Sequence, residues 1–142
     1  MAVEKNINNV MKSLMKIREF ARNGEIVPDR SLIKSTKDIL GIKKSAAINT
    51  GVLDHVAKHI HVGMSTGDID RLVYDYTVSH GAIPAPLNYE GFPKSVCTSV
   101  NDEVCHGIPD DEIILQEGDI VNVDVSTIFM VLLRCFANVY DW

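Results

Sequence analysis

The sequence feature that most constrains the fold is an alternating run between Asp119 and Phe129. Valines at every second position are separated by polar residues: Val121, Val123 and Val125, against Asn122, Asp124 and Ser126. Successive side chains of a strand point to opposite faces of a sheet. The pattern therefore predicts a β-strand with one face against an apolar core and one polar face.

The chain before this strand is mostly helical by pattern. Residues 4–22 have apolar side chains at helical spacing, and Asn23-Gly24 ends the run. A second helix is predicted from the capping-box-like Ser35–Asp38 to about Ile60, and a third from Ser65–Asp68 to about His80. The apolar stripe of the second helix is expected to comprise Ile39, Ile42, Ala46, Leu53, Val56, Ala57 and Ile60, and that of the third Ile69, Leu72, Val73 and Tyr76.

Beyond Gly81 the sequence changes to turns and short strands. Ser95–Val100 and Glu112–Leu115 are predicted as short β-type segments. The tail, Ser126–Trp142, contains an unbroken apolar run, which indicates either a buried strand or a sequence that was never selected to fold.

Composition narrows the functional classes. A formal charge of −5 argues against a nucleic-acid-binding domain, which would carry a basic face. No apolar run approaches the roughly 20 residues that span a bilayer, and the first residues lack the apolar core of a signal peptide. Three cysteines, an odd and sparse set, predict a reduced, cytoplasmic protein. The length of 142 residues suits one ordinary domain.

Three sets of residues could carry chemistry. Asp124 stands inside a strand, where aspartate is unfavourable, so either a metal ion or solvent is expected to face it. His106 lies in a loop, where it could transfer a proton or serve as the base for Cys97 or Cys105. Adjacent Cys105 and His106 point to opposite sides of an extended chain, and the three residues lack the spacing of a closed zinc site. The segment 88–93 could wall an apolar pocket or be a surface loop with anchoring aromatics.

The ordered motifs N-Y-E-G-F-P-K-S-V-C-T-S-V-N-D-E-V-C-H-G-I-P-D, residues 88–110, and G-D-I-V-N-V-D-V, residues 118–125, closely resemble type I methionine aminopeptidase. The resemblance extends over residues 33–129 and implies an α+β fold, with helices packed on an antiparallel sheet, that forms the N-terminal half of the pita-bread fold. Residues 1–32 would be a helical N-terminal extension.

The resemblance also implies roles for individual residues. Asp124 matches the first aspartate ligand of a site for two divalent ions (Co, Mn, Fe or Zn). His106 matches a catalytic histidine that contacts the scissile peptide. Tyr89, Phe92 and Cys97 match positions that bind the methionine side chain, while Pro86 and Glu90 differ from some members. The implied activity is removal of the initiator methionine from nascent proteins by metal-activated water.

The tail departs from this family pattern. The second metal-bridging aspartate is expected eleven residues after Asp124, where Cys135 stands, and the remaining histidine and two glutamates would come from a second half. Codons for residues 130–142 can be chosen so that restoring two bases yields N-G-Y-Y-S-D-A-S-R-M-F-M-I, with aspartate at position 135. We therefore expect 130–142 to be an aberrant, out-of-frame tail on a truncated and inactive chain.

Two alternatives remain at this point. A half-fold could act as a non-catalytic binding module, or two copies could associate through the surface that the missing half would cover. A cysteine hydrolase that uses Cys97 or Cys105 with His106 is the other alternative. No membrane or nucleic-acid partner is expected.

Overall fold

The computed structural model describes residues 15–27, 33–130 and 132–141. For 132–139 and 141 it describes the backbone alone. The chain divides into two compact units, Met1–Ser35 and Thr36–Trp142. In the first unit, residues 15–22 are helical, as predicted, while residues 4–14 of the same predicted helix lie outside the described residues.

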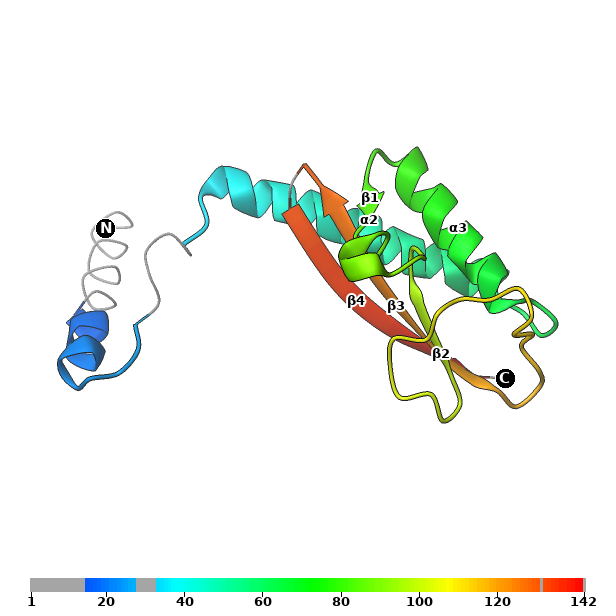
Figure 1. Cartoon of the computed structure of the whole chain (residues 1–142). Helices are drawn as coiled ribbons and strands as arrows, with labels where there is room; N and C mark the ends of the chain where they lie inside the picture. The colour runs from blue at the N-terminus through cyan, green and yellow to red at the C-terminus, as the bar shows by residue number, and fades with distance from the viewer. Residues whose placement is uncertain (1–14, 28–32, 131, 142) are drawn as a thin grey trace. The chain divides into compact units, whose positions relative to one another are not determined.

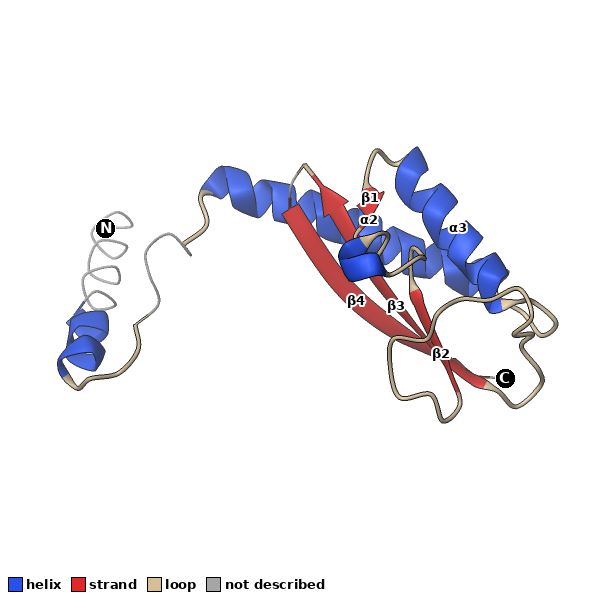
Figure 2. Ribbon diagram, viewed as in Figure 1, coloured by secondary structure: helices blue, strands red, loops and turns tan. Residues whose placement is uncertain are grey.

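The second unit contains two long helices and a four-stranded sheet (Figures 1 and 2). Its elements are α2 (Thr36–His59), α3 (Thr66–Ser79), β1 (Ile83–Pro84), the 3₁₀ turn η2 (Tyr89–Gly91), β2 (Cys97–Val100), β3 (Ile120–Phe129) and β4 (Leu132–Asp141). Strand β3 is central: it pairs antiparallel with β1 and β2 along one edge and with β4 along the other. The predicted strand at 119–129 and the antiparallel α+β architecture are thus confirmed.

The core lies between the two helices and the valine face of β3. Val121, Val123 and Val125 are fully buried, as the alternation predicts. They pack with buried residues from both helices and from the connecting segments: Val52, Val56, Ile69, Val73, Val96 and Leu115. The opposite face of β3, which carries Asn122, Asp124 and Ser126, is only half-buried. A sheet covered by helices on one face therefore leaves its polar face for a site.

The predicted start of α3 is confirmed in detail. Ser65 is the N-cap: its hydroxyl accepts from the backbone N–H of Asp68, and the Asp68 carboxylate accepts from the backbone N–H of Ser65. Arg71 adds an ion pair to the same carboxylate at 2.6 Å. These hydrogen bonds lower the pKa of Asp68 to about 2, with Arg71 the largest cause and Ser65 the next.

The predicted apolar stripe of α2 is partly wrong. Its buried face consists of Ser45, Asn49, Val52 and Val56, whereas Ile39 and Ala57 are exposed. Polar residues are buried here because they bond to β3: Ser45 Oγ donates to the carbonyl of Thr127 at 3.1 Å, and Asn49 Nδ2 donates to that of Val125 at 3.2 Å. A polarity pattern cannot identify buried side chains whose hydrogen bonds are satisfied by another element.

The segment Glu112–Leu115 is not a strand, which corrects the prediction. It forms one isolated bridge, between Ile114 and Ser65. Its backbone groups bond to the turn before α3 instead: Leu115 N–H donates to Met64 at 2.9 Å, and Gly63 N–H donates to Leu115 at 2.7 Å. A short apolar run has the same pattern whether it pairs in a sheet or lies against a helix terminus.

Residues 132–141 of the tail form a strand. Strand β4 pairs with β3 along ten consecutive positions, from Ile120–Asp141 to Phe129–Leu132. Tyr140 packs against the core, and its hydroxyl donates to the carbonyl of Leu53 at 3.0 Å. No helix in the described part of the chain is long and apolar enough to cross a membrane.

Candidate functional site

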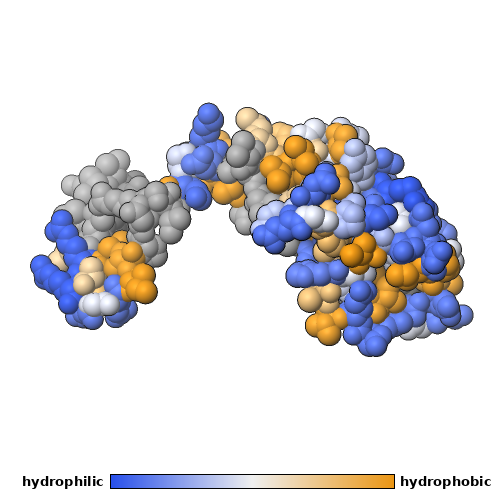
Figure 3. All heavy atoms as spheres, viewed as in Figure 1, coloured by the Kyte–Doolittle hydropathy of each residue, from blue (hydrophilic) through white to orange (hydrophobic). Residues whose placement is uncertain are grey.

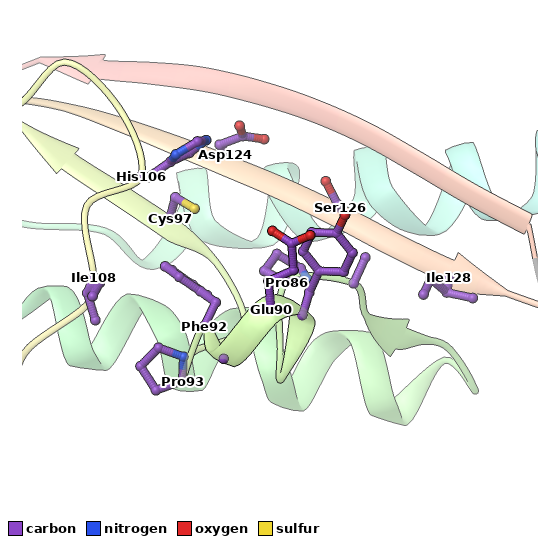
Figure 4. Close-up of a pocket in the computed structure, with 13 residues that line it drawn as sticks. Pro86, Glu90, Phe92, Pro93, Cys97, His106, Ile108, Asp124, Ser126 and Ile128 are labelled. Carbon is purple, nitrogen blue, oxygen red and sulfur yellow. The ribbon is translucent and has the colours of Figure 1, made fainter.

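A pocket of about 920 Å³ opens on the polar face of the sheet (Figure 4). All five residues predicted for the site line it: Tyr89, Phe92, Cys97, His106 and Asp124. Eight further residues complete the wall: Ala85, Pro86, Glu90, Gly91, Pro93, Ile108, Ser126 and Ile128. The structure therefore brings together side chains from four separate segments of the chain.

The sheet supplies the floor of this pocket. Cys97 of β2 stands directly opposite Asp124 of β3 in the antiparallel register. Directly opposed residues project to the same face, so the thiol and the carboxylate share one side of the sheet. Ser126 and Ile128 continue the same face of β3 at steps of two residues. This periodicity is the signal by which the sequence could have placed both of them in the pocket.

The segment 85–93 forms one wall. Its start is fixed to β3 by a hydrogen bond from the backbone N–H of Ala85 to the carbonyl of Ser126, at 2.8 Å. It then turns tightly through left-handed backbone at Asn88 and Glu90. A hydrogen bond from Asn88 N–H to the carbonyl of Phe92, at 2.8 Å, closes the turn. The segment 88–93 thus lines a pocket, which is one of the two alternatives predicted for it. Its Tyr89 is nevertheless 67% exposed.

The opposite wall is the loop that carries His106 and Ile108. His106 has left-handed backbone, with φ at 57°. The next residue, Gly107, is buried against β2: its N–H donates to Ser99 Oγ at 3.2 Å, and its carbonyl accepts from the N–H of Thr98 at 2.9 Å. The loop is therefore attached to the strand next to Cys97, which sets the imidazole beside the thiol and Asp124 in Figure 4.

The N-terminus of α3 fixes the far end of the same loop. Thr66 Oγ1 donates to the carbonyl of Asp110 at 3.0 Å and accepts from its N–H at 2.9 Å. Arg71 reaches across to Asp111 at 2.8 Å. Sequence reasoning did not predict these contacts, because they join segments about 40 residues apart.

The side chains that line the pocket are mostly apolar, and two of them are acidic. Asp124 and Glu90 contribute carboxylates, and no Lys or Arg is among the lining residues. Aromatic, proline and aliphatic side chains make up most of the rest. Such a pocket suits a ligand that combines an apolar side chain with a positive charge.

A centre for two metal ions does not fit the described side chains of this pocket. Among them, no three His, Cys, Asp or Glu residues gather closely enough to hold an ion. A site for two divalent ions needs several carboxylate or imidazole ligands. Asp124 alone does not provide such a site, and no step that depends on a bound ion follows from these residues.

Cys105 does not belong to this pocket. It is an exposed free thiol, and it is absent from the pocket wall. Of the two cysteines considered as a partner for His106, only Cys97 shares the pocket with it.

Comparison with known proteins places these features in one family. The sequence profile of metallopeptidase family M24 matches residues 41–131. Methionine aminopeptidase 1 of Saccharomyces cerevisiae is 51% identical over 85 residues, which are 60% of this chain and 22% of the relative. The methionine aminopeptidase of Rickettsia prowazekii is 45% identical over 96 residues, 68% of this chain and 37% of that protein.

Solved structures agree with the sequence comparison. The crystal structure of the Rickettsia prowazekii methionine aminopeptidase superposes with a TM-score of 0.74 at 40% identity, covering 77% of this chain and 44% of the other. An X-Pro aminopeptidase of Thermotoga maritima, at 19% identity, shares the fold with a TM-score of 0.63. The second unit is thus part of a pita-bread fold, and the chain spans less than half the length of these relatives. With its family profile matched over most of its length, the chain belongs to metallopeptidase family M24.

Proposed function

We propose that the pocket is the methionine-binding part of a methionine aminopeptidase site. The supporting observation is that Tyr89, Phe92, Cys97, His106 and Asp124, each assigned from the sequence motifs, line one cavity. In this proposal Tyr89, Phe92 and Cys97 contact the methionine side chain. His106 hydrogen-bonds to the peptide group that follows the methionine. Asp124 is one ligand of the two divalent metal ions (Co, Mn, Fe or Zn) that the complete site would hold.

Hydrolysis by this 142-residue chain is not part of the proposal. The side chains that the structure describes lack a group of three metal ligands, so they cannot activate water in the way that the family requires. The chain would bind N-terminal methionyl peptides of nascent proteins in the cytoplasm without cleaving them. The out-of-frame origin of residues 130–142 remains a prediction, and the nucleotide sequence after codon 129 would test it.

Peptide binding and hydrolysis can be measured separately. We expect Met-Ala-Ser to shift the NMR signals of the pocket residues, and Gly-Ala-Ser to shift them less, because glycine leaves the apolar wall uncovered. Phe92→Ala should weaken Met-Ala-Ser binding, while Ile83→Ala, an exposed β1 residue outside the pocket, should not. Equal binding of both peptides would contradict the proposal.

The activity assay gives the second arm. With added Co²⁺ or Mn²⁺ we expect no release of methionine from Met-Ala-Ser above a no-protein control. Turnover that disappears in Asp124→Asn would show instead that the chain holds a working metal site.

Self-association of two half-folds, without catalysis, is the second candidate. It is favoured by apolar side chains that are exposed at the pocket, among them Tyr89 and Ile108. Light scattering during size-exclusion chromatography distinguishes a defined dimer from a monomer or from aggregates.

A further inference from the structure

A row of aromatic rings joins the ends of α2 and α3, away from the pocket. The rings of His55 and His59 have centroids 4.2 Å apart, His55 lies 5.0 Å from Tyr76, and Tyr76 stacks on His80 at 4.1 Å. His55 is half-buried, while His59 and His80 are exposed. None of these residues lines the pocket or belongs to a motif that carries the proposed function.

Hydrogen bonds decide which nitrogen of the His59 ring can bind a ligand. His59 Nδ1 lies 2.8 Å from the backbone carbonyl of His55, one turn earlier. A carbonyl only accepts, so Nδ1 donates this hydrogen bond, and Nε2 is the nitrogen left to bind an ion. Histidines that bind metals usually have this arrangement, with the second nitrogen held by a backbone carbonyl or a carboxylate.

The spacing of the two rings suits a single ion. His55 and His59 are four residues apart on one helix, and such pairs lie on the same face, as in helical zinc motifs. Two imidazole nitrogens bound to one ion at about 2.0–2.1 Å stand roughly 3 Å apart. The two rings, with centroids 4.2 Å apart, lie side by side, and rotation about their side-chain bonds would bring one nitrogen of each to a shared ion.

Two other groups lie near the pair, Lys58 and His80. Lys58 is a cation at the same end of α2, so its charge weakens the binding of a metal ion. His80 does not complete a three-ligand group within the described residues, so water fills the remaining positions.

We propose that His55 and His59 form a surface site for one borderline divalent cation, Zn²⁺ or Ni²⁺, separate from the peptide pocket. Imidazole ligands prefer these ions to Mn²⁺, which favours oxygen ligands. In this proposal the ion binds at the end of α2, outside the peptide pocket. Binding of one such ion would then report this pair of histidines and not the pocket.

The test is titration of the tag-free, reduced chain with NiCl₂ at pH 7.5, followed by calorimetry and by the imidazole signals in NMR. We expect one ion per chain, with the signals of His55 and His59 perturbed first. His59→Gln should weaken binding by about tenfold or more, because one ligand cannot chelate. His59 is exposed, so this variant keeps the fold, which circular dichroism verifies.

Three matched variants locate the ion. His61→Gln removes a neighbouring exposed histidine whose Nδ1 is held by the carbonyl of His59 at 2.8 Å, and it should bind Ni²⁺ as the parent does. Asp124→Asn and Cys105→Ser should also bind normally. Full binding in His59→Gln, or loss of binding in Asp124→Asn or Cys105→Ser, would overturn the proposal.

Discussion

Gly107 lies so close to the backbone carbonyl of Thr98 that a β-carbon at residue 107 would overlap the carbonyl oxygen. The same two residues are joined by a hydrogen bond of 2.9 Å from Thr98 N–H to the Gly107 carbonyl. The loop that carries His106 is thus held to β2 at a distance that only glycine permits.

Gly107→Ala should destabilise the protein by about 2 kcal/mol or more, because the obstructing atom belongs to the backbone and the loop must move away. Urea unfolding measures this loss, and NMR should show displaced signals for His106 and Cys97. Gly118→Ala is the control: its φ of 89° carries a strain cost, but no atom lies within 4 Å of the added carbon. An equal loss in both variants, with the pocket signals unmoved, would contradict the role assigned to Gly107.

Asp68 should make stability depend on pH in acid. Its folded pKa, about 2, lies below the ordinary value of 3.8, mainly because of the hydrogen bond from Arg71. A depressed pKa stabilises the folded state fully above about pH 4, and this stabilisation is lost as the pH falls towards 2. For a side chain that is 43% exposed we expect about 1 kcal/mol after solvent screening.

Urea unfolding at several pH values checks this by comparison of the parent chain with Asp68→Asn. The difference in free energy of unfolding should shrink between pH 4 and pH 2. The comparison is needed because the pKa of Asp119 is also lowered, chiefly by its hydrogen bond from Asn101, and acts in the same direction. A constant difference for Asp68→Asn would refute the prediction.

The sequence predicted most of what positions the site. Alternation in β3 placed Asp124 on the face opposite the buried valines, and the Ser65–Asp68 box located the start of α3. These features were predictable because each depends on residues close together in the sequence. The same period-two face placed Ser126 beside Asp124, although the sequence interpretation did not assign Ser126 to the pocket.

What the sequence did not reveal depends on contacts between distant segments. Ser45 and Asn49 are buried because carbonyls of β3, about 80 residues away, accept their hydrogen bonds. Leu115 bonds to the turn at Met64 and so leaves the sheet. Neither residue type nor periodicity encodes such partners, so polar core residues and loops held against helix ends were assigned wrongly.

Asn49 is expected to be the most sensitive polar residue of α2. It donates to the carbonyl of Val125 at 3.2 Å and accepts from Thr127 Oγ1 at 2.9 Å, all in the buried core. Asn49→Ala leaves both groups without these bonds, which should cost about 2–3 kcal/mol in urea unfolding. Thr50→Ala, the exposed next residue, should change stability by less than about 0.5 kcal/mol. Similar effects in the two variants would mean that the buried network contributes nothing.

The last strand can be tested through Tyr140, whose hydroxyl bonds to Leu53 of α2. If β4 is folded on β3, Tyr140→Phe loses one hydrogen bond and should lower the free energy of unfolding by about 1 kcal/mol. The control is Tyr74→Phe, at a ring that is 43% exposed on α3, where the change should stay below about 0.5 kcal/mol. Hydrogen exchange gives an independent check, because the amides of Val121, Val123 and Val125 should be protected when β3 is paired and packed. A stable Tyr140→Phe variant in which residues 132–141 exchange freely would show that the tail does not form the strand, and the core would then end at β3.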